Sequence, residues 1–414
     1  MAAEGYLSAP PGLLKGRVMV KLSGLFRYPV KSCRGLDESR LWVGAEGLVG
    51  DRRYMVVRPD GSFITARTHP QLQQVRALWR EAGICLRTPG QSDLELFSAQ
   101  FDQERVATGV WSDSFSARVT RMEADAWFSQ LLGEPARLLW LGESSPRYRA
   151  KLQQHVSFAD GYPLLLISQA SLDDLNRRSP TPQRMEQFRP NLVVSGTAAF
   201  AEDGWRRIRI GEVEFLVAKP CSRCVMTTLD AESGHYHPQR EPLATLATYR
   251  LGEDGEIYFG QNLIPLNEGW VSVSDPVEVL ETQIATIYPE RPRLPAEQVA
   301  APIRPQVQED ETLARSVSTR FTVRISTEEG DASFQADPER PLLIQAEEGG
   351  VQLPHACRAG ICGRCKQLLI AGEVEQPQVP GLSASQREDG LILTCCASAR
   401  SDLILVKPPL SFRR

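Results

Sequence analysis

The sequence predicts a β-rich, mixed α/β fold divided among several domains. At ~100–200 residues per domain, its 414 residues correspond to two to four domains. Short alternating or apolar stretches bounded by turn residues are frequent, whereas segments with helical spacing are few. Prolines are dense between residues 288 and 307, which indicates a linker between independent cores. Many short strands with few helices favour barrel-like sheets over a doubly wound parallel sheet.

The expected elements follow the chain in order. Before the proline-rich segment, strands are expected at 17–28, 53–57, 62–66, 164–167, 191–195, 208–211, 214–218, 270–274 and 277–280. Apolar residues recur at helical spacing in 123–132 and 169–178. After the proline-rich segment, 320–326 and 332–335 are expected to form a hairpin. Segment 341–348 begins with proline and is followed by two glycines, which indicates a short helix.

Composition and charge exclude several functional classes. The chain carries 47 Lys and Arg residues against 51 Asp and Glu residues, and this balance does not favour nucleic-acid or anionic-membrane binding. No apolar stretch approaches the ~20 residues that span a bilayer. The first 21 residues lack the ordered parts of a secretion signal. We therefore expect a cytoplasmic protein whose nine cysteines are reduced, and whose clustered cysteines bind metal or react.

Four cysteines near the C-terminal end have the most specific spacing in the chain. Cys357, Cys362 and Cys365 form the pattern C-x4-C-x2-C, and Cys395 follows after 29 intervening residues. This is the plant-type spacing for a [2Fe–2S] cluster. A structural zinc site would use paired C-x2-C units or Cys/His sets. A Rieske centre would need two histidines, and His355 is the only histidine beyond the proline-rich segment.

Residues 319–408 resemble a plant-type ferredoxin domain. The resemblance includes Ile392-Leu393-Thr394 directly before the last ligand, and it implies a β-grasp fold and one-electron transfer. Since adjacent residues on a strand point to opposite faces, we expect Cys395 to be the fourth ligand and Cys396 to point away.

Two groups of residues before the proline-rich segment suit an anionic ligand. Lys31 and Ser32 follow a predicted strand, with Arg52 further along the chain, and such residues near strand ends bind phosphate or other oxyanions. A solvated basic loop is the alternative. Arg189 and Asn191 stand two apart at a strand start and so point to one side, where they bind a ligand or serve as buried structural residues.

A third group centres on a thiol. Cys221 follows a predicted strand between two cations, and nearby cations favour the thiolate, which is the form that binds metal. With Cys224 it could also form a redox disulfide or half of a zinc site. His235 and His237 could complete such a zinc site, but their spacing is irregular.

Taken together and in this order, these segments resemble the MOSC family with its N-terminal β-barrel partner domain. The similarity is to the bacterial YcbX type and to the mitochondrial amidoxime-reducing component. It implies a barrel-like domain at 18–120, a MOSC domain at 121–287, a linker at 288–317 and the ferredoxin-type domain at 318–414. The matching segments are 28–33, 50–52, 65–67, 158–163, 188–191, 220–224 and 259–263.

The resemblance also implies cofactors, site residues and a reaction. A molybdenum cofactor would be bound through the Cys221 thiolate, and Asp160 would handle a proton. The residues implied as contacts of its phosphate and pterin are Lys31, Ser32, Arg52, Arg189 and Asn191. The [2Fe–2S] domain would deliver electrons, received from a separate flavoprotein reductase, for the reduction of small N-hydroxylated compounds to amines and water.

Three alternatives compete with this interpretation. The first is a sulfur carrier or sulfurtransferase with a persulfide on Cys221, but cofactor sulfurases carry a pyridoxal-phosphate domain for which the chain has no room. The second is a ferredoxin-type electron-transfer module without catalysis. The third is a flavin-dependent oxygenase reductase, for which the sequence lacks both an R-x-Y-[ST] flavin motif and a G-x-G-x-x-G motif.

Overall fold

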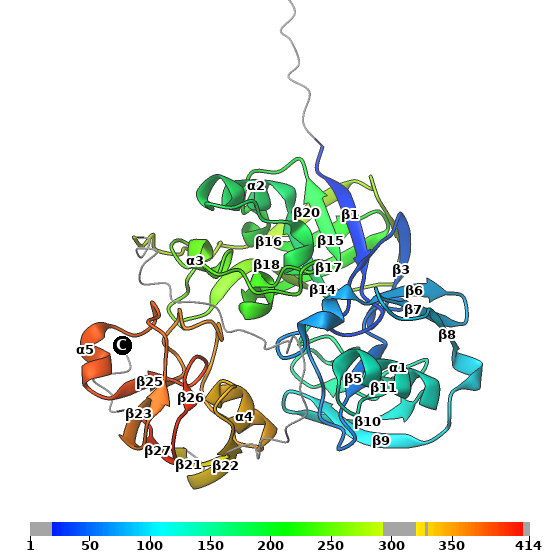
Figure 1. Cartoon of the computed structure of the whole chain (residues 1–414). Helices are drawn as coiled ribbons and strands as arrows, with labels where there is room; N and C mark the ends of the chain where they lie inside the picture. The colour runs from blue at the N-terminus through cyan, green and yellow to red at the C-terminus, as the bar shows by residue number, and fades with distance from the viewer. Residues whose placement is uncertain (1–18, 293–319, 328–329, 409–414) are drawn as a thin grey trace, which may run out of the picture.

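The computed structural model describes residues 19–292, 320–327 and 330–408 (Figure 1). Most of the expected linker at 288–317 therefore lies outside the described residues. The predicted β-rich, mixed fold is confirmed, because strands from all parts of the chain pair into several sheets with short helices at their edges. No helix in the described ranges is long and apolar enough to cross a membrane.

The largest sheet contains eight strands and lies in the upper part of the view in Figure 1. Only one neighbouring pair, β14 with β15, is parallel, and the other pairs are antiparallel. Its inward side chains form an apolar core with fully buried leucine, valine and isoleucine residues. The strand order is β2 (Leu36–Asp37), β1 (Lys21–Arg27), β15 (Leu192–Ser195), β14 (Leu164–Ser168), β18 (Ile257–Pro265), β17 (Val213–Arg223), β16 (Trp205–Ile210) and β20 (Val277–Thr282).

Smaller sheets complete the N-terminal half. A four-stranded sheet has the order β5 (Tyr54–Val57), β11 (Arg137–Trp140), β10 (Asp113–Val119) and β9 (Arg105–Val110). Two three-stranded sheets have the orders β6 (Arg76–Arg80), β7 (Gly83–Arg87), β8 (Leu94–Phe97) and β19 (Gly269–Ser272), β3 (Arg40–Gly44), β4 (Gly47–Leu48). The last pair is β12 (Tyr148–Arg149) with β13 (Gln154–His155).

These sheets interleave the two N-terminal domains that the sequence suggested. Strand β1 pairs with β15 in the large sheet, and β11 pairs with β5 and β10. Both pairings join residues on the two sides of position 120. The helices here are α1 (Met122–Leu132), α2 (Gln169–Arg178) and α3 (Leu243–Leu246).

The C-terminal domain has its own sheet and core (Figure 1). Its helices are α4 (Leu342–Glu348) and α5 (Ala384–Glu388), and β24 (Val374–Glu375) pairs with β26 (Ser398–Ala399). Strand β21 is antiparallel to its hairpin partner β22 and parallel to β27, as in a β-grasp fold. The sheet order is β22 (Gly330–Ala336), β21 (Phe321–Thr327), β27 (Leu403–Val406), β23 (Lys366–Ala371) and β25 (Leu391–Leu393).

The loop that carries three of the four clustered cysteines packs against the central domain. Cys357 and Ala359 are buried in the apolar core formed mainly by the N-terminal half. The backbone N–H of Val225 donates to the carbonyl of Cys357 at 2.9 Å. Arg364 also donates to the backbone carbonyl of Asp254. The loop is therefore attached to the central domain by apolar packing and by direct hydrogen bonds.

Two expectations about strands are wrong. Segment 62–66 does not return as a strand, since its only bridge joins Phe63 to Val57. A turn then begins at Thr65, whose carbonyl accepts hydrogen bonds from the N–H groups of Thr68 and His69.

Strand β25 ends at Leu393, so Cys395 and Cys396 lie in a turn. The N–H groups of Cys396 and Ala397 both donate to the carbonyl of Leu393. Strand alternation therefore cannot decide which of the two cysteines is the ligand.

Phe259→Ala should destabilise the central domain strongly. The side chain is fully buried, and its ring centroid lies 4.5 Å from that of Phe188. Removing such a side chain costs about 3–5 kcal/mol. Urea unfolding followed by tryptophan fluorescence measures the change. Phe97→Ala is the control, because Phe97 is 41% exposed, and an equal loss in both variants would contradict the proposed packing.

Candidate functional site

One cavity of about 550 Å³ collects the chemically notable side chains of the central region. Its wall is built by residues from both N-terminal domains and from the cysteine loop of the C-terminal domain. Every sequence-predicted residue outside the C-terminal domain lies on it. These residues are Lys31, Ser32, Arg52, Asp160, Arg189, Asn191 and Cys221. The same wall carries Cys224, Glu256 and Arg358, which the sequence analysis did not assign to the site.

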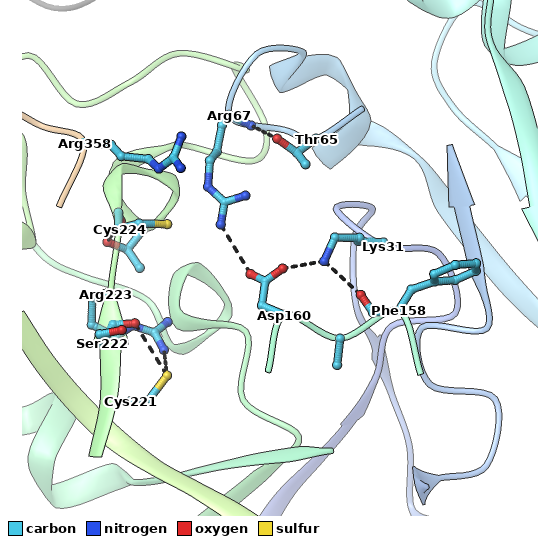
Figure 2. A network of polar contacts seen from close by, with 12 residues as sticks. Lys31, Thr65, Arg67, Phe158, Asp160, Cys221, Ser222, Arg223, Cys224 and Arg358 are labelled. Carbon is cyan, nitrogen blue, oxygen red and sulfur yellow. Dashed lines mark hydrogen bonds and ion pairs between the residues drawn. The ribbon is translucent and has the colours of Figure 1, made fainter. Parts of the chain in front are cut away.

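Asp160 joins two cations at the cavity (Figure 2). One carboxylate oxygen binds the ammonium of Lys31, and the other lies 3.3 Å from Arg67 Nη2. Lys31 Nζ also donates to the carbonyl of Phe158 at 2.8 Å. Burial alone would raise the pKa of Asp160, but these two cations hold it well below its usual range. Burial lowers the pKa of Lys31 to about 8 against the opposing effect of Asp160.

This environment bears on the proton role predicted for Asp160. A carboxyl whose pKa lies far below neutral is ionised at physiological pH and is a poor proton donor. Its geometry suits a different task, which is to fix the ammonium of Lys31 and the guanidinium of Arg67 toward the cavity. The role of Asp160 in proton transfer stays a prediction.

Two cysteines face the cavity at the end of β17, where the chain leaves the large sheet. Arg223 Nη1 lies 3.0 Å from Cys221 Sγ, and Cys221 also donates to the carbonyl of Ser222 at 3.7 Å. Cys224 directly follows the strand, and its sulfur points toward Arg67 (Figure 2). Burial raises the pKa of the Cys224 thiol, but Arg67 and the backbone N–H of Met226 outweigh it and lower the pKa below its ordinary value.

An aromatic ring positions two of the predicted anion-binding arginines. The guanidinium carbons of Arg52 and Arg189 lie 4.2 and 4.3 Å from the ring centroid of buried Tyr28. The Tyr28 hydroxyl donates to the carbonyl of Pro190 at 3.0 Å. Arg52 Nη1 donates to Asn191 Oδ1 at 3.1 Å. Tyr28 thus links two arginines that are distant in sequence, and it holds both at the cavity.

The polar groups of this wall fit an anionic, phosphate-bearing cofactor. Two buried guanidinium nitrogens at the cavity, Arg67 Nε and Arg223 Nε, have no hydrogen-bond partner among the described residues. Leaving buried donors without partners is costly, and both arginines line the cavity, where an anion would offset their charge. The fixed cations suit a phosphate group, and the thiol beside them suits a metal that prefers sulfur ligands.

The C-terminal cysteines gather in the folded chain. The Cys362 thiol lowers the pKa of Cys357 to about 6, and both the Cys365 and the Cys396 thiols raise the pKa of Cys395, so Cys395 lies close to both of them. Among residues 19–292, 320–327 and 330–408, no group of three or more His, Cys, Asp or Glu side chains could hold one metal ion. The spacing of the cysteines along the chain matches a cluster with two irons rather than a single zinc.

The backbone of the cysteine loop also supports this interpretation. The N–H groups of Ala359 and Cys362 point at Cys357 Sγ, at 3.4 and 3.3 Å. Such donors stabilise thiolate sulfur in iron–sulfur sites. Cys395 contacts both Cys365 and Cys396, and the Cys396 sulfur also lies 3.7 Å from Arg240 Nη1. Cys395 as the fourth ligand stays a prediction.

Two further residues on the wall could not be found from spacing alone. Glu256 is half-buried, and burial raises its pKa to about 7, with smaller contributions from Asp254 and Cys357. Arg358 belongs to the cysteine loop, where its guanidinium binds both oxygens of Glu347 at 2.7 and 2.5 Å. Neither stands at a ligand position of a motif. Arg358 reaches the cavity through the docking of the two domains, and Glu256 lies on the wall directly before β18.

Comparison with known proteins agrees with this arrangement. Family models match residues 19–135 (MOSC N-terminal beta barrel domain), 153–278 (MOSC domain) and 326–400 (2Fe-2S iron-sulfur cluster binding domain). Mitochondrial amidoxime reducing component 2 of Bos taurus is 33% identical over 276 residues, which are 62% of this chain and 82% of the relative. The protein of the same name from Homo sapiens is 35% identical, with coverage of 56% and 73%.

Two other similarities cover smaller shares of the compared proteins. A molybdenum cofactor sulfurase of Oryza sativa subsp. japonica is 32% identical over 58% of this chain and 32% of its own length. A solved ferredoxin reductase in carbazole 1,9a-dioxygenase is 34% identical, covers 22% of this chain and 27% of its own, and has a TM-score of 0.20.

Tyr28→Leu should weaken anion binding in the cavity by about tenfold. Leucine fills space but has no π-face for Arg52 and Arg189, and each such contact contributes about 0.5–2 kcal/mol. Titration calorimetry with pyrophosphate on the cofactor-free protein measures the loss. Tyr28→Phe is the matched control, since it keeps the ring and removes only the hydrogen bond to Pro190. Equal affinities in all three proteins would contradict the positioning role.

Proposed function

This chain belongs to the MOSC-domain family of the amidoxime-reducing components, and we propose that it reduces N-hydroxylated compounds to amines: R–NHOH + 2e⁻ + 2H⁺ → R–NH₂ + H₂O. Its cofactors are a molybdenum–molybdopterin cofactor and a [2Fe–2S] cluster. One observation carries the proposal. The cavity wall contains a thiol flanked by cations together with residues of the cysteine loop, so both cofactor sites meet at one cavity.

The chain offers several candidate contacts for the pterin and its phosphate. Arg52 and Arg189 are stacked on Tyr28 at the cavity, where Arg52 also pairs with Asp51 and Arg189 donates to the carbonyl of Cys33. Guanidinium groups of this kind bind phosphate. Ser32 and Asn191 add short polar groups on the same wall, and Lys31 adds an ammonium held by Asp160. These are the residues that the sequence analysis proposed, and their convergence supports the assignment.

For the molybdenum thiolate, the geometry favours Cys224 over Cys221. Cys224 points toward Arg67, a cation that stabilises its thiolate and is itself held by Asp160. Cys221 is turned toward Arg223 and toward the backbone of Ser222. The sequence favoured Cys221 because cations flank it along the chain, but sequence adjacency does not show which cation each sulfur meets in the fold.

When bound, the molybdenum cofactor supplies a metal centre that can take an oxygen atom and change by two electrons. The chain supplies the route by which electrons reach it one at a time. Val225, next to Cys224, donates its backbone N–H to the carbonyl of Cys357, so a covalent path broken by one hydrogen bond connects the two thiols. This contact supports electron delivery from the chain's own [2Fe–2S] domain.

Glu256 is better suited than Asp160 to supply a proton. Its pKa of about 7 keeps a large fraction protonated at neutral pH, whereas Asp160 stays ionised. Glu256 lies on the cavity wall, close enough to the cysteine loop for Cys357 to affect its pKa. We assign Glu256 to proton donation and Asp160 to holding Lys31 and Arg67.

Partners and location belong to the same proposal. The cavity size suits small N-hydroxylated molecules, and a separate flavoprotein reductase would supply electrons to the C-terminal domain. All nine cysteines are free in the structure, which agrees with a reducing, cytoplasmic location.

The proposed function predicts that the purified chain contains molybdenum and iron and converts benzamidoxime to benzamidine with a flavoprotein reductase and NADH. Cys224→Ser should lose molybdenum and turnover, and it should keep the visible and EPR spectra of the cluster. Cys221→Ser should keep most of the metal and turnover. Metal analysis and product chromatography measure both.

Three results would contradict this assignment. Loss of molybdenum in Cys221→Ser but not in Cys224→Ser would identify Cys221 as the molybdenum ligand. Wild-type protein with iron but no turnover would indicate an electron carrier. Cyanide-releasable sulfur in a molybdenum-free protein would indicate a sulfur carrier.

Turnover should also depend on the ionisation of Glu256. The acid with a pKa of about 7 is protonated below that pH, so wild-type turnover should fall as the pH rises through 7. Glu256→Gln cannot donate a proton, and it should lose about 100-fold in kcat at pH 6 together with this pH limb. Asp254→Asn is the matched variant. Because the Asp254 carboxylate raises the pKa of Glu256, removing its charge should move the limb to lower pH. If Glu256→Gln showed the same pH dependence of turnover as the wild type, Glu256 would not be the proton donor.

A further inference from the structure

Arg240 is a buried arginine of the central domain that reaches into the cysteine site of the C-terminal domain. It lies in the loop before α3 and is only 4% exposed. Its Nη1 atom lies 3.7 Å from Cys396 Sγ. Its Nη2 atom is buried and has no hydrogen-bond partner among the described residues. A buried guanidinium donor therefore remains unsatisfied beside the cluster cysteines.

The cysteine loop is shaped to receive this side chain. A Cβ on Gly360 would lie 2.7 Å from both Arg240 Nη1 and Cys396 Sγ, so only glycine leaves the arginine room. Gly360 has a φ of +68°, a conformation that side chains other than glycine rarely adopt. The Cys396 sulfur in turn lies 3.5 Å from that of Cys395. Arg240 is thus one residue away from a proposed ligand, across the domain boundary.

Two arginines of the loop itself already have partners. Arg358 is paired with both oxygens of Glu347, and Arg364 donates to the backbone carbonyl of Asp254. Within the described part of the chain, Arg240 forms no ion pair with a carboxylate. Its charge is therefore not neutralised locally, and in a buried site such a charge acts strongly on its neighbours.

We propose that Arg240 is a positioning residue that raises the reduction potential of the [2Fe–2S] cluster while the two domains are docked. Reduction adds one electron, taken from an external donor, and no proton, so the cluster gains one negative charge. A buried cation with a free N–H favours that reduced form, and hydrogen bonds to the sulfurs and local charge are known determinants of cluster potential. This effect of Arg240 requires only the bound cluster and does not depend on the substrate proposed above.

The consequence is that the central domain sets the potential of the C-terminal domain. Electrons from the external donor would be accepted more readily when the cysteine loop is in place against the cavity. Separation of the domains would remove the cation and lower the potential.

Arg240→Gln in the full chain with its cluster tests the proposal. Its neutral side chain should lower the equilibrium constant for reduction of the cluster about tenfold, which for one electron is about 59 mV. An EPR-monitored titration with dithionite and mediators measures the potential without any substrate. Arg240→Lys keeps the charge and should lower the potential by less than half of that amount.

The matched control is Arg58→Gln. Arg58 lies 3.4 Å from Glu348 of the C-terminal domain and makes no contact with a cysteine. This variant removes an arginine from the same interface and should leave the potential unchanged. An unchanged potential in Arg240→Gln would overturn the proposal, and so would an equal shift in Arg58→Gln.

A second measurement decides the question if Arg240→Gln does not fold. Wild-type protein and Arg240→Lys are labelled with ¹⁵N-arginine, reduced and compared by pulsed EPR. The wild type should show a nitrogen coupling to the reduced cluster that Arg240→Lys lacks. Identical couplings in the two proteins would overturn the proposal.

Discussion

The backbone hydrogen bond from Val225 to the carbonyl of Cys357 is the contact on which the functional arrangement depends. It joins the residue after Cys224 to the first cysteine of the C-terminal loop. Buried Cys357 and Ala359 extend the apolar core of the central domain around it. Without this docking, the cavity would lose part of its wall and Arg240 would not reach the cysteine site.

Charge is the second organising feature of the molecule. The cavity wall is rich in lysine and arginine, and several of these cations are held in place by carboxylates. Tyr28 stacks against Arg52 and Arg189, Asp51 pairs with Arg52, and Asp160 bridges Lys31 and Arg67. An anionic cofactor bound at this wall would compensate the positive charge that remains.

Positions of unusual backbone geometry coincide with this wall. Ser32, Arg52 and Arg189 all have positive φ values, which residues other than glycine rarely adopt. Strained conformations of this kind cluster at ligand sites, where the surrounding structure imposes them. Here they turn the polar side chains of three separate segments toward one cavity.

The sequence by itself determined the cysteine cluster, the anion-binding segments and most strands, because these depend on spacing, periodicity and turn residues along the chain. The pattern C-x4-C-x2-C and the alternation in β1 or β21 are local properties of that kind. Only the tertiary structure decided that Cys224 rather than Cys221 points toward Arg67, and that Glu256 and Arg240 stand beside the cofactor sites. The position of each of these side chains depends on its burial and on the distant charges that it contacts. The pairing of strands and the docking of domains set both the burial and the contacts, so neighbouring residues in the sequence do not reveal them.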